Sequence, residues 1–104
     1  MDVGLWSPIW NITAISNTNI DQIITMNTYT NNKNTWYNTF NEVINLIPNN
    51  LLVIGLECDE TALSTSDLIL RFEELKRNNI KKIAIWRNPI PNNWWLYLDD
   101  FILL

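Results

Sequence analysis

The chain has 104 residues, of which 47% are hydrophobic, and a formal net charge of -4. This length provides for a single domain, 1–104, and this apolar content provides a packed core, which excludes an intrinsically disordered chain. The acidic balance argues against binding to phosphate backbones, so nucleic acid is not expected as a partner.

Four short apolar runs follow one another at similar intervals. They are continuous rather than alternating, which is typical of strands buried on both faces of a parallel sheet. The predicted strands are Val3 to Trp6, Ile20 to Met26, Leu51 to Leu56 and Ile80 to Trp86.

The segments between these runs have helical patterns. After the first strand, Ser7-Pro8 forms a cap and first turn, but the apolar pattern lasts barely two turns. The spacing predicts a helix over Thr35 to Ile47, capped by Asn34 and ended by Pro48, and a second over Thr65 to Arg77. A last helix is expected from near Asn93. The predicted inward residues are Trp36, Phe40, Val43, Ile44 and Ile47, then Leu68, Phe72 and Leu75, then Trp94, Leu98 and Phe101.

Three groups of residues are interpreted as structural. Asn doublets at 31–32, 49–50, 78–79 and 92–93 are predicted to replace Gly in loops, because Asn tolerates the left-handed conformation. Glu73 and Arg77 are expected to pair on the solvated side of their helix. The cations between 71 and 82 are expected at a solvated helix end and strand start, and the ending "FILL" is expected to dock the last helix; these cations are Arg71, Lys76, Arg77, Lys81 and Lys82.

The alternation predicts an α/β fold with four β-α units and a parallel sheet. It fits half of an eight-stranded β/α barrel, resembling the C-terminal half of a TIM barrel, or a small doubly wound domain. Short strand-to-helix connections and a first strand close to Met1 favour the half barrel. Such a half would leave its inner face and two strand edges uncovered, so a homodimer or a missing N-terminal half is the expected partner.

The available chemistry is narrow. The chain has no histidine, one cysteine and two glycines, which removes imidazole catalysis, imidazole metal sites and phosphate-cradling loops. No metal and no cofactor are expected. Without a base nearby in the sequence, Cys58 is interpreted as inert.

In β/α barrels the working residues gather at the carboxyl ends of the strands. Here those ends carry Trp6, Asn27, Tyr29, Glu57 and Trp86. Rings together with amides and a carboxylate suit a carbohydrate. Two alternatives stay open: the two tryptophans close the end of a core, and Glu57 forms a salt bridge with Arg87 or Lys82 or is simply exposed at the rim.

The segments "IITMNTYT", "NNLLVIGLE" and "IKKIAIWR" resemble the sixth, seventh and eighth strands of the family 18 glycoside hydrolases, the chitinase-like barrels, and of related sugar-hydrolase-like barrels. In this resemblance Tyr29 corresponds to the sixth-strand tyrosine and Trp86 to the tryptophan that floors the sugar site. Met26 precedes Tyr29 by three residues rather than two, and Thr30 stands where the family has an aspartate.

The family's acidic catalytic motif lies on its fourth strand, to which no segment corresponds here. The resemblance therefore implies a glycoside-hydrolase-like barrel fragment, inactive as an isolated chain, with a vestigial or partner-completed carbohydrate rim. Glycoside cleavage needs two groups, and Glu57 supplies at most one of them. The alternative is a small α/β structural or protein-interaction module that binds no sugar.

The start Met1-Asp2-Val3-Gly4 lacks the cationic and apolar segments of a signal peptide, and no apolar run approaches the ~20 residues of a membrane helix. Taken as written, the chain is expected in the cytoplasm and away from membranes. A fragment of a longer hydrolase would instead come from a secreted or lysosomal protein.

Overall fold

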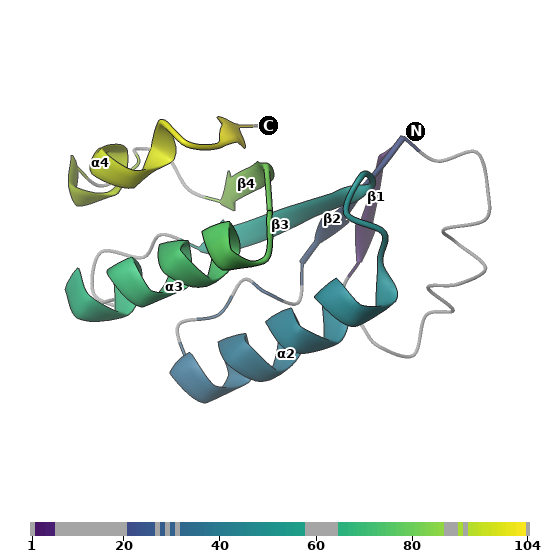
Figure 1. Cartoon of the computed structure of the whole chain (residues 1–104), viewed down its shortest axis with the longest axis horizontal. Helices are drawn as coiled ribbons and strands as arrows, with labels where there is room; N and C mark the ends of the chain where they lie inside the picture. Colours follow the sequence, from purple (N-terminus) through teal and green to yellow (C-terminus); the bar gives the residue numbers. More distant parts are fainter. Residues whose placement is uncertain are drawn as a thin grey trace.

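Strands and helices alternate along the chain (Figure 1). The computed structural model describes residues 2–5, 21–26, 28, 30, 32–57, 65–86, 90 and 92–103. The short first crossover that was predicted after Trp6 lies outside these residues. The elements are β1 (Asp2–Leu5), β2 (Gln22–Thr25), α2 (Lys33–Leu46), β3 (Leu52–Glu57), α3 (Thr65–Arg77), β4 (Lys82–Trp86), the 3-10 turn η1 (Asn92–Trp94), α4 (Trp95–Leu98) and β5 (Ile102–Leu103).

The strands form one parallel sheet in the order β1-β2-β3-β4-β5. The α/β class and the parallel sheet are therefore confirmed. A doubly wound sheet reverses its strand order at a switch point, and the described strands contain no such reversal. Buried side chains of α2, α3 and α4 belong to one cluster, so these helices pack on the same face of the sheet.

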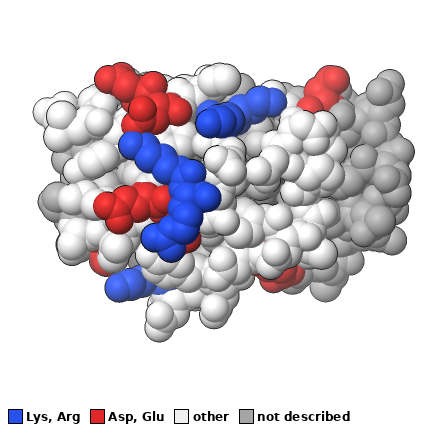
Figure 2. Space-filling model, viewed as in Figure 1, with Lys and Arg blue, Asp and Glu red and all other residues white. Residues whose placement is uncertain are grey.

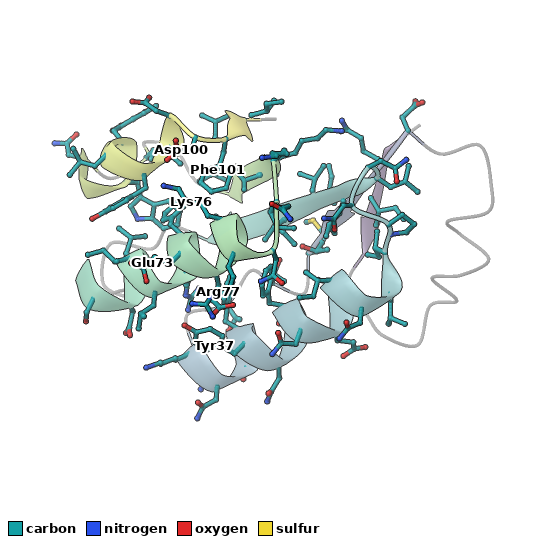
Figure 3. All side chains as sticks on the ribbon, viewed as in Figure 1. Tyr37, Glu73, Lys76, Arg77, Asp100 and Phe101 are labelled. Atoms are coloured by element: carbon teal, nitrogen blue, oxygen red, sulfur yellow. The ribbon has the colours of Figure 1, made fainter. Side chains whose placement is uncertain are left out.

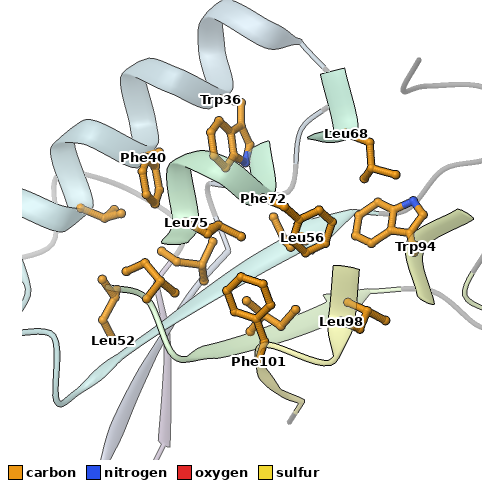
Figure 4. Close-up of a cluster of buried hydrophobic side chains, with 14 of the residues drawn as sticks. Trp36, Phe40, Leu52, Leu56, Leu68, Phe72, Leu75, Trp94, Leu98 and Phe101 are labelled. Carbon is orange, nitrogen blue, oxygen red and sulfur yellow. The ribbon is translucent and has the colours of Figure 1, made fainter. Parts of the chain in front are cut away.

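The core lies between this face and the helices (Figure 4). The predicted inward residues of both long helices are buried in it, apart from Ile44, which is partly buried. Phe72 is at the centre of an aromatic group, with ring centroids 5.6 Å from Trp94, 5.4 Å from Tyr97 and 5.5 Å from Phe101. Aromatic pairs at such distances add about 0.5–1.5 kcal/mol each beyond their burial, so this group fixes α4 against α3.

The C-terminal segment differs from the prediction. The helix ends at Leu98, where the Phe101 amide donates to the Leu98 carbonyl and closes a turn. The next two residues form β5, and the Ile102 amide donates to the Lys81 carbonyl at 2.8 Å. The open edge of β4 thus offers backbone partners to residues that were expected only to dock a helix.

One Asn residue caps the start of α2, and another ends α3. The cap of α2 is Asn32 rather than Asn34, because the Asn32 Oδ1 accepts from the Thr35 amide at 3.0 Å. At the end of α3, Asn79 has φ 58°, in the left-handed region. The Asn79 amide donates to the Lys76 carbonyl and the Ile80 amide to the Leu75 carbonyl, both at 3.0 Å, which is the Schellman pattern.

Two further surface predictions are corrected. Arg77 pairs with Glu74, three residues before it, at 2.8 Å, instead of with Glu73, four residues before it. The doublet Asn49-Asn50 has no positive φ; a turn there is closed by the Leu51 amide donating to the Pro48 carbonyl. Replacement of Gly by Asn is therefore confirmed at Asn79 and wrong at Asn49-Asn50.

The face of the sheet opposite the helices is not open at its centre. Leu52, Ile54 and Leu56 belong to the helix-side core, so the alternation of the strand places Val53 on the other face. Val53 is 0% exposed and Ala84 is 8% exposed. The expectation of an uncovered inner face is therefore wrong for Val53 and Ala84, in the middle of β3 and β4.

Candidate functional site

The carboxyl ends of β3 and β4 meet at one edge of the sheet. In the parallel register Gly55 lies opposite Ala84, Leu56 opposite Ile85 and Glu57 opposite Trp86. Neighbouring strands are about 4.8 Å apart, so the last residues of β3 and β4 are adjacent. Two of the five residues expected at the rim are thus brought together at backbone level.

The other three expected rim residues, Trp6, Asn27 and Tyr29, lie outside the described residues, as does Cys58. Their strands are nevertheless in place: Leu5, the residue before Trp6, lies opposite Thr25, the last residue of β2. The carboxyl ends of all four predicted strands therefore lie along the same edge of the sheet.

The register fixes how far along β4 one predicted salt-bridge partner of Glu57, Lys82, lies from it. Lys82 begins β4, four positions before Trp86, or about 13 Å along the strand. Lys82 thus lies on the neighbouring strand but not opposite Glu57, and the salt bridge of Glu57 with Lys82 or Arg87 stays a prediction. Arg87 lies outside the described residues.

A buried hydroxyl network holds the segment that follows β2. The Thr28 hydroxyl donates to the Gly55 carbonyl at 2.6 Å, and the Thr25 and Thr28 hydroxyl oxygens lie 2.6 Å apart. The Gly55 amide in turn donates to the Thr25 hydroxyl at 3.1 Å. Both threonines are fully buried, so their hydroxyls join the end of β2 to β3 and leave the network without solvent contact.

Arg71 is the residue that the sequence interpretation placed wrongly. It is 3% exposed rather than solvated. Its Nη1 donates to the Thr30 carbonyl at 2.7 Å, and its Cζ lies 5.1 Å from the centroid of the Trp36 ring. Leu68, Arg71, Phe72 and Leu75 have the i, i+3, i+4, i+7 spacing of an inward stripe, and that spacing is the sequence signal for its burial.

A shallow hollow of about 250 Å³ lies at the opposite end of the sheet, before β4 begins. It is lined by Lys76, Ile80, Lys81 and Asp100, and Lys76 Nζ is 2.6 Å from the Asp100 carboxylate (Figure 3). Both partners of this ion pair are more than half exposed. The hollow is therefore separate from the candidate rim, and its paired charges give it no evident ligand.

Charges of both signs are mixed on the face shown in Figure 2, over α3 and α4. Where its residues are described, this face has no broad patch of a single sign. Within the described residues, no three His, Cys, Asp or Glu side chains are grouped closely enough to hold a metal ion. In the same part of the chain, the helices are too short or too polar to cross a membrane.

Comparison with known proteins finds no match among protein-family models, curated proteins or solved structures. Any functional assignment therefore depends on the geometry of the strand ends and on the sequence resemblance.

Proposed function

We propose that the chain is a glycoside-hydrolase-like barrel fragment whose strand ends bind a carbohydrate. The observation that carries this proposal is the register that puts Glu57 beside Trp86 at the carboxyl edge of the sheet. The five residues proposed to contact the sugar are Trp6, Asn27, Tyr29, Glu57 and Trp86.

The strand order supports the barrel part of the proposal. Parallel strands that follow one another in sequence, with their helices on one face, are the arrangement found in β/α barrels. In such folds the loops at the carboxyl ends form the binding site, and in the sequence the candidate residues end these strands or closely follow them. Aromatic rings there can stack on sugar faces while amides and a carboxylate hold hydroxyls.

The same reasoning predicts binding without cleavage. Glycoside hydrolysis needs one group to protonate the leaving oxygen and a second to attack or stabilise the anomeric carbon. Among the strand-end residues that the structure describes, Glu57 is the one carboxylic acid that could take either role. The isolated chain is therefore expected to lack hydrolase activity, and a partner or missing half would have to supply the second group.

The test is a titration of the chain with chito- and gluco-oligosaccharides, followed by Trp fluorescence. A saturable response is expected, and it should disappear in a Tyr29→Ala/Trp86→Ala double variant. Trp95→Ala is the control, since Trp95 is half exposed on α4 and is not a rim residue. No response of the unaltered chain at millimolar sugar would refute the proposal.

A second candidate, a protein-interaction module, is favoured by the exposed apolar residues near β5. Trp95, Leu96, Ile102 and Leu103 are 50%, 78%, 57% and 41% exposed. Sheet edges with apolar side chains invite pairing with another chain. Light scattering separates the candidates: a self-associating chain that ignores sugars supports the module, and a monomer that binds sugar supports the rim.

A further inference from the structure

Between β2 and α2, Thr28, Thr30 and Asn32 each form a hydrogen bond that anchors the chain. Thr28 bonds to β3 through the Gly55 carbonyl at 2.6 Å, and the Thr30 carbonyl accepts from Arg71 of α3 at 2.7 Å. Asn32 caps α2, and its amide donates to the Thr30 hydroxyl at 3.2 Å. Thr28, Thr30 and Asn32 are thus held by contacts with three different elements.

Arg71 is the one charged residue among these anchors, and its place is closely specified. It is buried, and its Cζ lies over the ring of Trp36, which is itself 0% exposed and stacked on Phe40 at 4.8 Å. A planar guanidinium can stack on a ring and donate in its own plane at the same time, whereas the ammonium of lysine is a compact charge that cannot do both. The Arg71 geometry therefore fits a residue that fixes a carbonyl.

We infer that Arg71 is a positioning residue of the connection between β2 and α2: by holding the Thr30 carbonyl against α3, it fixes Thr30, which in the sequence directly follows the proposed sugar contact Tyr29. The inference depends on the proposed function only for the meaning of this segment as a rim. The anchoring itself is a property of the chain with or without a sugar.

The experiment compares Arg71→Met, which keeps length and apolar contact, with Arg71→Lys, which keeps charge. Arg77→Met is the matched control, because Arg77 lies on the same helix with a side chain 70% exposed. Amide hydrogen exchange is measured at Thr30, Asn32 and Thr35 and compared with Val53, Ile54 and Leu56 in β3. Since a hydrogen bond from a charged donor is worth about tenfold or more in local opening, Arg71→Met should speed exchange in the first group by roughly that factor.

Exchange in β3 should change far less, Arg71→Lys should recover part of the protection, and Arg77→Met should match the unaltered chain. Unchanged exchange at Thr30 and Asn32, or an equal loss in β3, would overturn the inference, since Arg71 would then be dispensable or only a core element. If Arg71→Met does not fold, Arg71→Lys decides by the same comparison. If the unaltered chain binds no sugar, the proposed function is refuted, but the exchange result still tests the role of Arg71. If it does bind sugar, Arg71→Met should weaken the binding and Arg77→Met should not.

Discussion

The left-handed residue that ends α3 gives the sharpest test of how this glycine-poor sequence builds its turns. Asn79 has φ 58°, and the amides of Asn79 and Ile80 close the helix end. The left-handed conformation costs a residue with a Cβ roughly 1–2 kcal/mol, and Asn somewhat less, whereas Gly has no such cost. At an ordinary helical position the order is reversed, since Gly is worse than Ala by about 0.5–1 kcal/mol.

Gly and Ala variants at two positions, Asn79 and Asn50, are therefore expected to rank in opposite orders of stability. At position 79, Gly should be more stable than Ala by about 1 kcal/mol, which is a difference of about 4–8 °C in Tm for a domain of this size. At Asn50, in a turn without a positive φ, Ala should equal or exceed Gly. Urea unfolding of the four variants measures both differences. An Asn79→Ala variant as stable as Asn79→Gly would show that the left-handed cap does not govern this turn.

Two further predictions concern the hydroxyl network and the surface between α2 and α3. Thr28→Val leaves the buried Gly55 carbonyl without its donor at 2.6 Å and should lower the free energy of unfolding, measured in urea, by about 1–3 kcal/mol. The control Thr39→Val, on a partly exposed side of α2, should lower it much less. Equal losses in the two variants would contradict the role of the network. Burial, and next the charge of Glu74, raise the pKa of Tyr37 above its usual 10.0. The fold therefore favours the protonated phenol, so this stability is present below about pH 10 and is lost as the pH rises through the folded pKa. Tyr37→Phe should unfold less readily than the unaltered chain as the pH increases beyond 10, and an identical alkaline decline in both would refute the assignment.

The long elements could be predicted because their patterns are local. The helix over Thr65 to Arg77 was predicted with the bounds that the structure has, since one apolar stripe and a polar side specify it without reference to other segments. The end of the chain could not be predicted in this way. Two apolar residues carry no periodicity, and Ile102–Leu103 becomes a strand only because β4 has an open edge beside it.

The candidate site likewise has one part that the sequence predicts and another that it does not. The closeness of Glu57 and Trp86 follows from one rule, that parallel strands end at a common edge, so the sequence predicts it once the strands are recognised. The anchors of the β2–α2 segment follow no such rule. The hydroxyl of Thr28 meets a carbonyl 27 residues away in sequence, and threonines at strand ends are too common to indicate such a contact.

Arg71 shows why charge alone misleads. Its type places it with the solvated cations of 71–82, whereas its spacing from Leu68 and Leu75 places it on the buried stripe of α3. Burying a guanidinium is unfavourable unless hydrogen bonds and a ring replace water, and the structure provides a carbonyl at 2.7 Å and the Trp36 indole. The carbonyl belongs to Thr30, after β2, and the indole belongs to α2, so the burial of Arg71 and the position of Thr30 are parts of the same arrangement. Position on the helix sets where the side chain lies, and the neighbouring loop determines whether a charge there can be tolerated.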